Sequence, residues 1–236
     1  MADSSGSRYL LRADALPGGA LTVFRFSGDE AISTPFEMRM DLVADDTDID
    51  GAPLPGAKAT LDLGPSSFTG SRLFHGVLSR FRFTGTAADG RGLYAATLRP
   101  RLWLLSRTRR SRIFATETPM TIPAIVTRVL QDDLGLTTAD YDLRLTADYP
   151  EREHVVQYQE TDLAFVSRLL EHWGIAYFFE HTAATDRLIL TDRNVGFHSE
   201  ASLDSAEWRE HDDTDTRGGS HVLRYAPGAG MAAGET

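Results

Sequence analysis

The stretch of sequence that decides the fold is Tyr149–His181, YPEREHVVQYQETDLAFVSRLLEHWGIAYFFEH. It predicts a strand, a capped helix and a second strand. The first strand covers His154–Gln159, where β-branched residues favour an extended backbone. Thr161 is expected to cap the helix, because its hydroxyl can accept a hydrogen bond from a free N–H group of the first turn. The second strand covers Ile175–Glu180.

The helix between these strands carries a wide apolar stripe, because its apolar residues recur every three and four positions. The stripe consists of Leu163, Val166, Leu169, Leu170 and Trp173. Asp162 places a carboxylate in the first turn, where the helix dipole favours a negative charge. Gly174 suits the left-handed conformation that ends a helix. We therefore expect one helix between two strands, with its apolar face against a sheet.

The first half of the chain predicts antiparallel strands. Apolar and polar residues alternate in four segments, Leu21–Gly28, Phe36–Ala44, Leu73–Gly85 and Leu93–Pro100. The pair Asp89-Gly90 is a hairpin signal that joins the last two of them. Such strands with short polar links form a sandwich or a barrel. Closure into a barrel is attractive because it removes edge strands, but the sequence leaves both alternatives open.

Near Pro119 the apolar period changes from two to nearly four and predicts another helix. Thr121 is its expected cap and Gly135 its end. Its stripe is Ile122, Ile125, Val126, Val129, Leu130 and Leu134. Strands follow at Tyr141–Leu145 and Arg187–Asp192. The predicted fold class is therefore α+β: an antiparallel β-structure followed by a smaller α/β domain of mixed strands with two main helices.

Composition argues against several functional classes. The net charge of −10 disfavours a general nucleic-acid binder, because phosphate contacts require excess positive charge. The absence of cysteine removes disulfides, thiolate metal sites and thiol nucleophiles. The first residues lack the apolar core of a signal peptide, and no apolar run approaches membrane-spanning length. Neither a signal peptide nor membrane insertion is therefore expected.

Three clusters deserve a functional test. Asp46, Asp48, Asp50 and Gly51 match the opening of a calcium loop, but Ala57 stands where a bidentate glutamate is required. The interpretation preferred here is a solvated acidic loop. The basic run surrounds Trp103 and a buried strand LWLL, and it is interpreted as a charged face for a protein partner rather than for nucleic acid. The run is Arg99, Arg101, Arg107, Arg109, Arg110 and Arg112.

The third cluster flanks the central helix and contains His154, His172, His181, Glu151, Glu153, Glu160 and Glu171. None of its spacings is a recognised metal pattern, and no G-x-S-x-G elbow occurs in the chain. No catalytic, cofactor-binding or metal-binding residue is therefore assigned. The expectation is a binding or structural role, without a cofactor and without enzymatic activity.

Four segments resemble, in order, the VgrG family, the spike proteins of the type VI secretion system. They are STPFEMRMDLVADDTDIDGAPLPGAKATLDLG, RLFHGVLSRFRFTG, LRPRLWLLSRTRRSRIF and QYQETDLAFVSRLLEHWGIAYFFEH. The second contains the R-x-F-H-G pattern as Arg72, Phe74, His75 and Gly76. Together they cover Leu21–Asp192. One departure is Ala164, where many relatives have an acidic residue that completes a capping box.

The resemblance implies a tail-tube-like antiparallel β-barrel over residues 1–115 and an α/β hub domain over residues 116–197. Residues 198–236 are then an acidic, Gly/Ala-rich linker or tail before a second barrel that is missing here. The implied function is the structural hub of a contractile injection machine. Its expected partners are its own copies in a homotrimer of the full-length protein, an Hcp-like hexameric tube, baseplate proteins and effectors. The arginine run and the acidic loop are candidate rim or subunit contacts.

Two alternatives remain. One is the baseplate hub of a contractile-tailed phage or a phage-derived particle. The other, from a different class, is a cell-wall hydrolase that uses Glu151, Glu160 and Glu171 for acid–base chemistry, although no paired-carboxylate arrangement is evident. The family also implies assembly in the bacterial cytoplasm, followed by ejection through the contractile apparatus.

Overall fold

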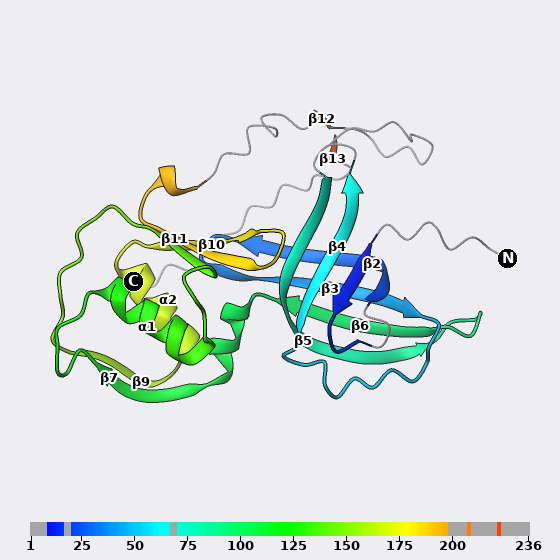
Figure 1. The fold of residues 1–236 in the computed structure, drawn as a ribbon, viewed down its shortest axis with the longest axis horizontal. Coiled ribbons are helices and arrows are strands. Elements are labelled where there is room, and N and C mark those ends of the chain that lie inside the picture. The colour runs from blue at the N-terminus through cyan, green and yellow to red at the C-terminus, as the bar shows by residue number, and fades with distance from the viewer. Residues whose placement is uncertain (1–8, 17–19, 67–69, 198–206, 209–220, 223–236) are drawn as a thin grey trace, which may run out of the picture.

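Six antiparallel strands close into a barrel in the computed structural model (Figure 1), which describes residues 9–16, 20–66, 70–197, 207–208 and 221–222. The order around the barrel is β1-β2-β3-β6-β5-β4. The strands are β1 Leu10–Ala13, β2 Ala20–Ala31, β3 Thr34–Ala44, β4 Lys58–Ser66, β5 Gly70–Thr86 and β6 Gly92–Arg99. Closure settles the choice between sandwich and barrel that the sequence left open.

Alternating side chains fill the barrel as their period predicts. Along β6 the residues alternate between buried and half-buried, so that Tyr94, Ala96 and Leu98 point into the core. The predicted hairpin joins β5 to β6, and Gly90 takes a positive φ of 88° in its turn. The strands predicted in the first half of the chain are therefore confirmed, in antiparallel register.

The sequence interpretation missed β1, although this strand is the one that closes the barrel. Leu11 of β1 pairs with Leu21 of β2 on one side and with Leu61 of β4 on the other. All three leucines are buried. Only four residues long, the strand is too short to show a period, so its state is decided by the two edges that it joins.

A second hydrophobic core lies beside the barrel. It contains two helices, α1 Ile122–Leu134 and α2 Asp162–His172, and a sheet of order β10-β11-β8. These strands are β8 Tyr141–Arg144, β10 Ala176–His181 and β11 Asp186–Thr191, with β8 parallel to β11 and β10 antiparallel to it. The ribbon of β7 Arg109–Phe114 and β9 Val155–Thr161 lies on the other side of the helices (Figure 1). The predicted mixed strands and two main helices are confirmed.

Both helices begin and end as predicted. Thr121 and Thr161 accept hydrogen bonds from the backbone N–H groups of Ala124 and Ala164, at 3.3 and 3.1 Å. The glycines that follow the helices, Gly135 and Gly174, both have a φ of 65°. These caps satisfy backbone groups that a helix cannot pair internally.

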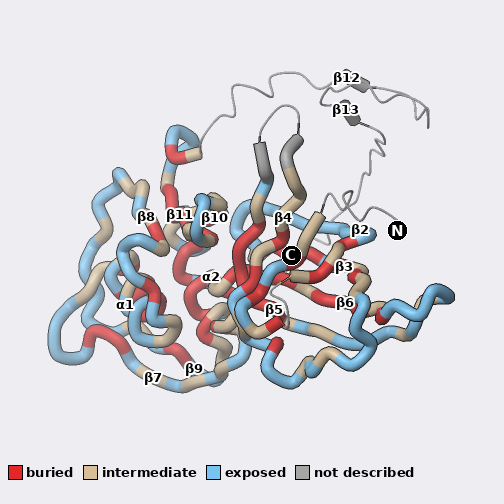
Figure 2. The backbone as a smooth tube through the Cα atoms, turned by 45° about the vertical axis from the view of Figure 1, so that its right-hand side comes forward, coloured by how far each residue is buried: buried red, intermediate tan, exposed pale blue. Residues whose placement is uncertain are grey.

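The apolar face of α2 differs in part from the predicted stripe. Phe165, which was left out of the stripe, is fully buried and stacks on Phe114, whereas Leu163 and Trp173 are only partly buried. The face contacts α1 and the 3-10 helix η1 Arg101–Arg107 as well as the sheet. The predicted packing of the helix against a sheet is confirmed, and the same face also packs on α1 and η1. Figure 2 shows the buried residues gathered in the helices and in the barrel strands.

The segment LWLL is not the buried strand that was predicted. It forms η1, in which Leu102 and Leu105 are buried and Trp103 is half-buried. Four consecutive apolar residues in a strand would point to both faces, whereas this short helix turns two of them into the second core.

The predicted domain boundary at residue 115 stays a prediction. Leu102, Leu105 and Phe114, which that boundary assigns to the barrel, lie in the second core. The described part of the remaining chain includes η2 Asn194–Gly196 and a short parallel pair, β12 Glu207–Trp208 and β13 His221–Val222. Most of the predicted linker, residues 198–236, lies outside the described residues. No helix among the described residues is long and apolar enough to cross a membrane.

Candidate functional site

The barrel meets the second core along β10. At this end β3 and β5 extend beyond β6, which pairs with β3 only from Met38 and with β5 only from Val77. The backbone N–H of Ser33, in the β2–β3 turn, donates to the carbonyl oxygen of Tyr177 at 2.7 Å. The β10–β11 hairpin thus covers this end of the barrel, and the two cores contact each other directly.

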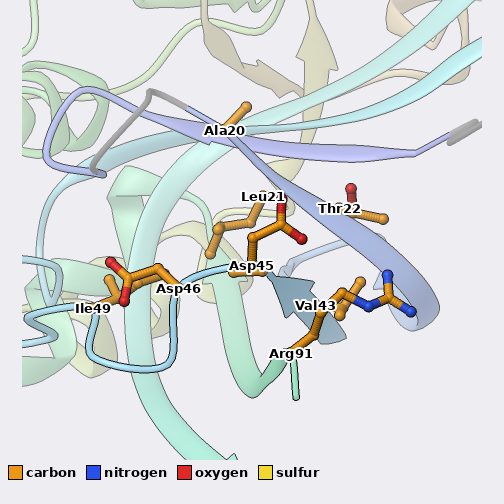
Figure 3. Close-up of a pocket in the computed structure, with 9 residues that line it drawn as sticks. Ala20, Leu21, Thr22, Val43, Asp45, Asp46, Ile49 and Arg91 are labelled. Atoms are coloured by element: carbon orange, nitrogen blue, oxygen red, sulfur yellow. The ribbon is translucent and has the colours of Figure 1, made fainter. Parts of the chain in front are cut away.

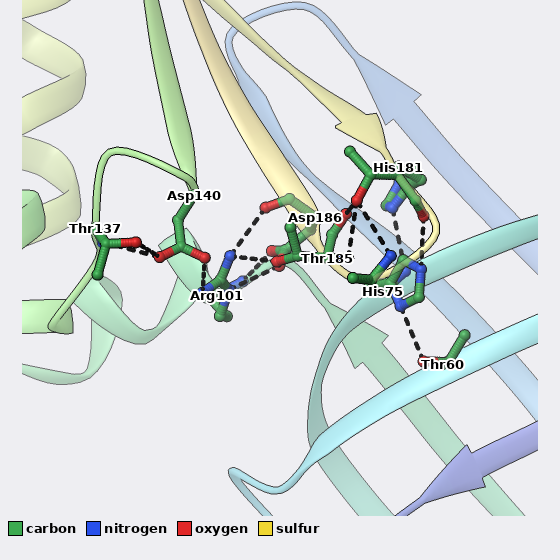
Figure 4. A network of polar contacts seen from close by, with 10 residues as sticks. Thr60, His75, Arg101, Thr137, Asp140, His181, Thr185 and Asp186 are labelled. Atoms are coloured by element: carbon green, nitrogen blue, oxygen red, sulfur yellow. Dashed lines mark hydrogen bonds and ion pairs between the residues drawn. The ribbon is translucent and has the colours of Figure 1, made fainter.

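Two histidines form the polar centre of this junction (Figure 4). His75 of β5 is buried, and its Nε2 lies 2.9 Å from the carbonyl oxygen of Thr182. Because a carbonyl only accepts, Nε2 carries the proton, and Nδ1 accepts from the hydroxyl of Thr60 at 3.0 Å. His181 accepts at Nδ1 from the backbone N–H of His75, so its proton is on Nε2.

His181 is held neutral by its surroundings. Its ring contacts the rings of Phe36 and Phe74, and Nε2 is buried without a hydrogen-bond partner among the described residues. Burial lowers its pKa from 6.5 to about 4, and the neighbouring His75 and Arg72 side chains act in the same direction. A cationic imidazolium would have no acceptor here, so the junction is built for the uncharged ring.

Gly76, next to His75, is required by close packing of the barrel. A Cβ atom at this position would overlap the backbone carbonyl of Arg99, at the end of the neighbouring strand β6. The histidine and the glycine of the R-x-F-H-G pattern therefore have structural roles, one at the junction and one at a close approach of two strands.

Arg101 links η1 to the β10–β11 turn and to the segment before β8 through hydrogen bonds and ion pairs (Figure 4). Its Nε donates to Asp186 at 2.7 Å, its Nη2 to the Thr185 hydroxyl at 2.6 Å, and its Nη1 lies 2.8 Å from Asp140. Asp140 in turn accepts from the backbone N–H and the hydroxyl of Thr137. These hydrogen bonds hold the pKa of Asp140 below its usual value, although burial acts in the opposite direction.

Two more arginines of the basic run enter a buried network below α2. Arg112 donates to Gln157 at 2.7 Å and to Asp133 and Asp162 at 2.7 and 3.1 Å. Arg110 pairs with Asp133 at 2.5 Å. The carboxylate of Asp162 is almost fully buried, so it serves both the helix N-terminus and this cluster.

The basic run is therefore not one open charged face, and that interpretation is corrected. Arg101, Arg110 and Arg112 are committed to internal ion pairs, and Arg99 pairs with Glu37 while its guanidinium lies over the ring of Trp103. Arg107 and Arg109, in the middle of the run, remain exposed. The sequence could not separate these roles, because the aspartates that bind them lie far away in the chain.

The acidic loop lies at the other end of the barrel strands. Asp46 and Asp50 accept hydrogen bonds from the backbone N–H groups of Asp48 and Ala52, which are two residues further on. A shallow cavity of about 250 Å³ lies beside the loop, lined by Leu21, Val43, Asp45, Asp46, Ile49, Arg91 and three neighbouring residues (Figure 3). The chemistry of this rim is that of a solvated carboxylate surface next to one arginine.

The predicted histidines and glutamates do not come together as one site. His154, Glu151 and Glu153 are exposed in the loop before β9, and Glu171 is exposed at the end of α2. Glu160 is bound by Arg168, at 2.6 Å. Of these residues, His181 lies in the junction between the two cores. Among the described residues no group of three or more histidine or acidic side chains could hold a metal ion.

Comparison with known proteins adds a family and several relatives. The model of the phage tail baseplate hub (GPD) family matches residues 29–236. The type VI secretion system spike protein VgrG1b of Pseudomonas aeruginosa is 38% identical over 189 residues, which are 78% of this chain and 24% of that protein. The actin cross-linking toxin VgrG1 of Vibrio cholerae is 30% identical and is covered over 17% of its length. The chain thus spans about a quarter or less of these relatives.

Solved structures share the fold. The E. coli c3393 protein, a component of the type VI secretion system with structural similarity to the T4 bacteriophage tail proteins gp27 and gp5, aligns with a TM-score of 0.72 at 29% identity. This alignment covers 80% of this chain and 50% of that one. The 43 kDa tail protein of prophage MuSo2 from Shewanella oneidensis aligns over 78% and 53% of the two chains, with a TM-score of 0.50 at 13% identity, and shows the fold alone. The resemblance to VgrG proteins is confirmed.

Proposed function

Because this chain belongs to the phage tail baseplate hub (GPD) family, we propose that it is a structural hub module of a contractile injection machine, part of a type VI secretion spike. The observation that supports this most strongly is the closed six-stranded barrel capped by the β10–β11 hairpin, in a fold similar to a type VI component. A barrel of this kind offers a rim and an outer surface for stacking rather than a catalytic cleft.

The partners follow from that role. An Hcp-like hexameric tube would stack on the barrel, and the full-length protein would be a homotrimer that also contacts baseplate proteins and effectors. Support comes from the spike proteins among the relatives. Such contacts join surfaces of complementary shape and charge, so the exposed acidic loop at the barrel rim is the candidate contact to the tube.

A second candidate function is the baseplate hub of a phage or a phage-derived particle, because a prophage tail protein has the same fold. The relatives at 34–38% identity favour the secretion spike. In either machine the protein would assemble in the bacterial cytoplasm and leave through the contractile apparatus.

No catalytic step is proposed for this segment. The relatives are named as spike proteins, and the toxin among them is matched over only 17% of its length. In the rival hydrolase hypothesis Glu151, Glu160 and Glu171 would need to cooperate, yet they lie on different elements and Glu160 is bound by Arg168. Cell-wall turnover that is lost on Glu160→Gln would overturn the structural assignment.

Binding to tube rings tests the proposal directly. The full chain is mixed with the hexameric tube protein from the same genome, and the mass of the complex is measured by light scattering. The double variant Asp45→Asn/Asp48→Asn should weaken binding about tenfold, the change that ~1.4 kcal/mol of lost contact energy produces. The control is the double variant Asp132→Asn/Glu171→Gln, which makes the same change in charge on exposed residues of α1 and α2. It should bind the rings like the wild type.

Each outcome has a clear meaning. Tube binding that weakens only in the loop variant supports the hub role and locates the rim contact. Equal weakening in both variants shows a general charge effect and removes the loop from the interface. A wild-type chain that forms no complex with the rings contradicts the proposed function for this segment.

A further inference from the structure

The ribbon of β7 and β9 presents an apolar face to solvent. Ile113 of β7 is opposite Val156 of β9, and Tyr158 lies two positions further along β9 on the same face. Their exposed fractions are 56%, 50% and 70%. Gln157, between the last two, is fully buried, as expected for a strand whose residues alternate between two faces. Large apolar side chains that adjoin one another on an exposed face are typical of a protein interaction site.

The ribbon lies within a continuously described part of the chain, from residue 70 to residue 197. Its exposure therefore does not depend on a neighbouring segment outside the described residues. Figure 1 shows the ribbon at the margin of the second core, with both helices on one side of it. The acidic loop, the candidate tube contact, follows β3 at the far end of the barrel. The ribbon face and the tube contact are thus separate surfaces.

A bulge in β9 holds Tyr158 outward. One residue of β7, Ser111, faces two residues of β9, Tyr158 and Gln159. Gln159 has a φ of 47°, a left-handed conformation that residues other than glycine rarely adopt. Its backbone N–H donates to the Ser111 hydroxyl at 3.1 Å, and its carbonyl oxygen accepts from Arg109 at 2.7 Å. Backbone strain that neighbouring side chains hold in place in this way is found mainly at functional sites.

The two ends of the ribbon carry opposite charges. Arg107 and Arg109 are exposed at one end and form no ion pair within the described part of the chain. At the other end, the segments that follow β7 and precede β9 stay side by side through one further bridge. Their exposed carboxylates are Glu117, Glu151 and Glu153. The face therefore has a cationic end, an apolar centre and an anionic end.

The face of the ribbon, rather than its edge, is suited to docking. Arg168 donates to the carbonyl oxygen of Val156 at 3.2 Å and pairs with Glu160 at 2.6 Å. It thereby covers the outer edge of β9, and a strand added there would have to displace it. A partner is therefore expected to lie across the side chains of Ile113, Val156 and Tyr158.

We infer that this face docks a baseplate protein, through a segment that has an apolar stripe between a carboxylate and a basic side chain. The carboxylate would face Arg107 and Arg109, and the basic side chain would face the glutamates at the other end. Two ribbons packed antiparallel about a twofold axis would also satisfy both ends, but that contact does not fit a homotrimer. The inference rests on the proposed function, because it assigns one of the partners named there to a surface.

Truncation of Tyr158 tests the centre of the face. The full chain is titrated with the purified baseplate proteins of the same genome. Tyr158→Ser should weaken their binding at least about tenfold, because a tyrosine at the centre of an interface carries a large share of the binding energy. The control is Val195→Ser in η2, which also removes an exposed apolar side chain, 86% exposed, and should bind like the wild type. Both side chains are mostly in solvent, so neither change should unfold the chain.

Photo-crosslinking identifies the occupant. Tyr158→p-benzoylphenylalanine, illuminated with the baseplate proteins, should give a covalent product with one of them, and the same replacement at Val195 should give far less. The inference is overturned if the product at Tyr158 contains a second copy of the chain, or if the two positions react equally. It is also overturned if Tyr158→Ser and Val195→Ser bind the baseplate proteins equally.

Tube binding separates this inference from the hub role. Tyr158→Ser should bind the tube rings like the wild type, because the ribbon is far from the acidic loop. A wild-type chain that binds tube rings but no baseplate protein overturns the inference and leaves the proposed function standing. A chain that binds neither contradicts both.

Discussion

The backbone N–H of His75 donates to Nδ1 of His181 over 3.1 Å, and this bond joins a barrel strand to the sheet of the second core. The two residues are 106 positions apart in the chain. Because the bond needs a free lone pair on His181, it exists only while that ring is in the neutral tautomer with its proton on Nε2. The contact between the two cores is therefore coupled to the protonation of one histidine.

Acid should weaken the protein through His181. Its folded pKa of about 4 lies below the ordinary 6.5, so the unfolded chain binds the proton more tightly and stability falls as the pH drops from 6.5 towards 4. The loss should approach ~3 kcal/mol in the free energy of unfolding, given ~1.4 kcal/mol for each unit of pKa difference. In His181→Asn, which keeps an acceptor but cannot titrate, denaturant unfolding across this range should show a flatter pH dependence. Equal slopes in both proteins would exclude His181 as the source.

The buried carboxylate of Asp162 should be indispensable to the second core. Asp162→Ala removes a partner of Arg112, at 3.1 Å, and leaves guanidinium charge without full compensation. Breaking a buried pair in this way destabilises by about 3–5 kcal/mol. Chemical denaturation should detect this loss, whereas Asp132→Ala, which breaks only an exposed pair with Arg128, should change stability by less than about 0.5 kcal/mol. Similar effects of the two variants would contradict the burial argument.

Gly76 and Gly90 should respond very differently to alanine. Gly76→Ala forces a methyl group into the carbonyl of Arg99, so strands β5 and β6 must separate at the junction. Gly90→Ala meets no atom within 4 Å, and only its positive φ of 88° is strained. Gly90→Ala should lower the free energy of unfolding by about 1 kcal/mol, and Gly76→Ala should lower it by clearly more. Thermal unfolding of the two variants measures this difference. A mild effect at Gly76 would show that the barrel yields there easily.

The hydroxyl of Tyr149, in the loop before β9, donates to Asp192, and this contact should be visible in the ionisation of the tyrosine. Burial, together with the Asp192 carboxylate 3.1 Å away, raises the pKa of Tyr149 to about 12. Burial acts to raise the pKa of Asp192, but hydrogen bonds from the backbone of Ala147 and Thr146 outweigh it and lower the pKa to about 2. Ultraviolet titration should show one tyrosine of the wild type ionising late, and Asp192→Asn should bring this ionisation to lower pH. An unchanged titration curve would mean that Asp192 does not act on the phenol.

The sequence by itself determined the local elements. Thr161, Gly174 and the stripe between them predict α2 because caps and apolar spacing act within a few residues of the chain. Alternation predicts the barrel strands, and Asp89-Gly90 predicts the hairpin between β5 and β6. Family resemblance carried the function further than any residue pattern, since no cluster in the chain has recognisable chemistry.

Only the tertiary structure decided what joins those elements. It showed that Arg101, Arg110 and Arg112 are held in internal ion pairs, which the sequence could not reveal because their partners Asp186, Asp133 and Asp162 are 21 to 85 residues away. It also selected β1 as a strand and placed His75 beside His181. Contacts between distant segments depend on how the chain folds in three dimensions, whereas local sequence preferences concern only residues that are close together in the chain.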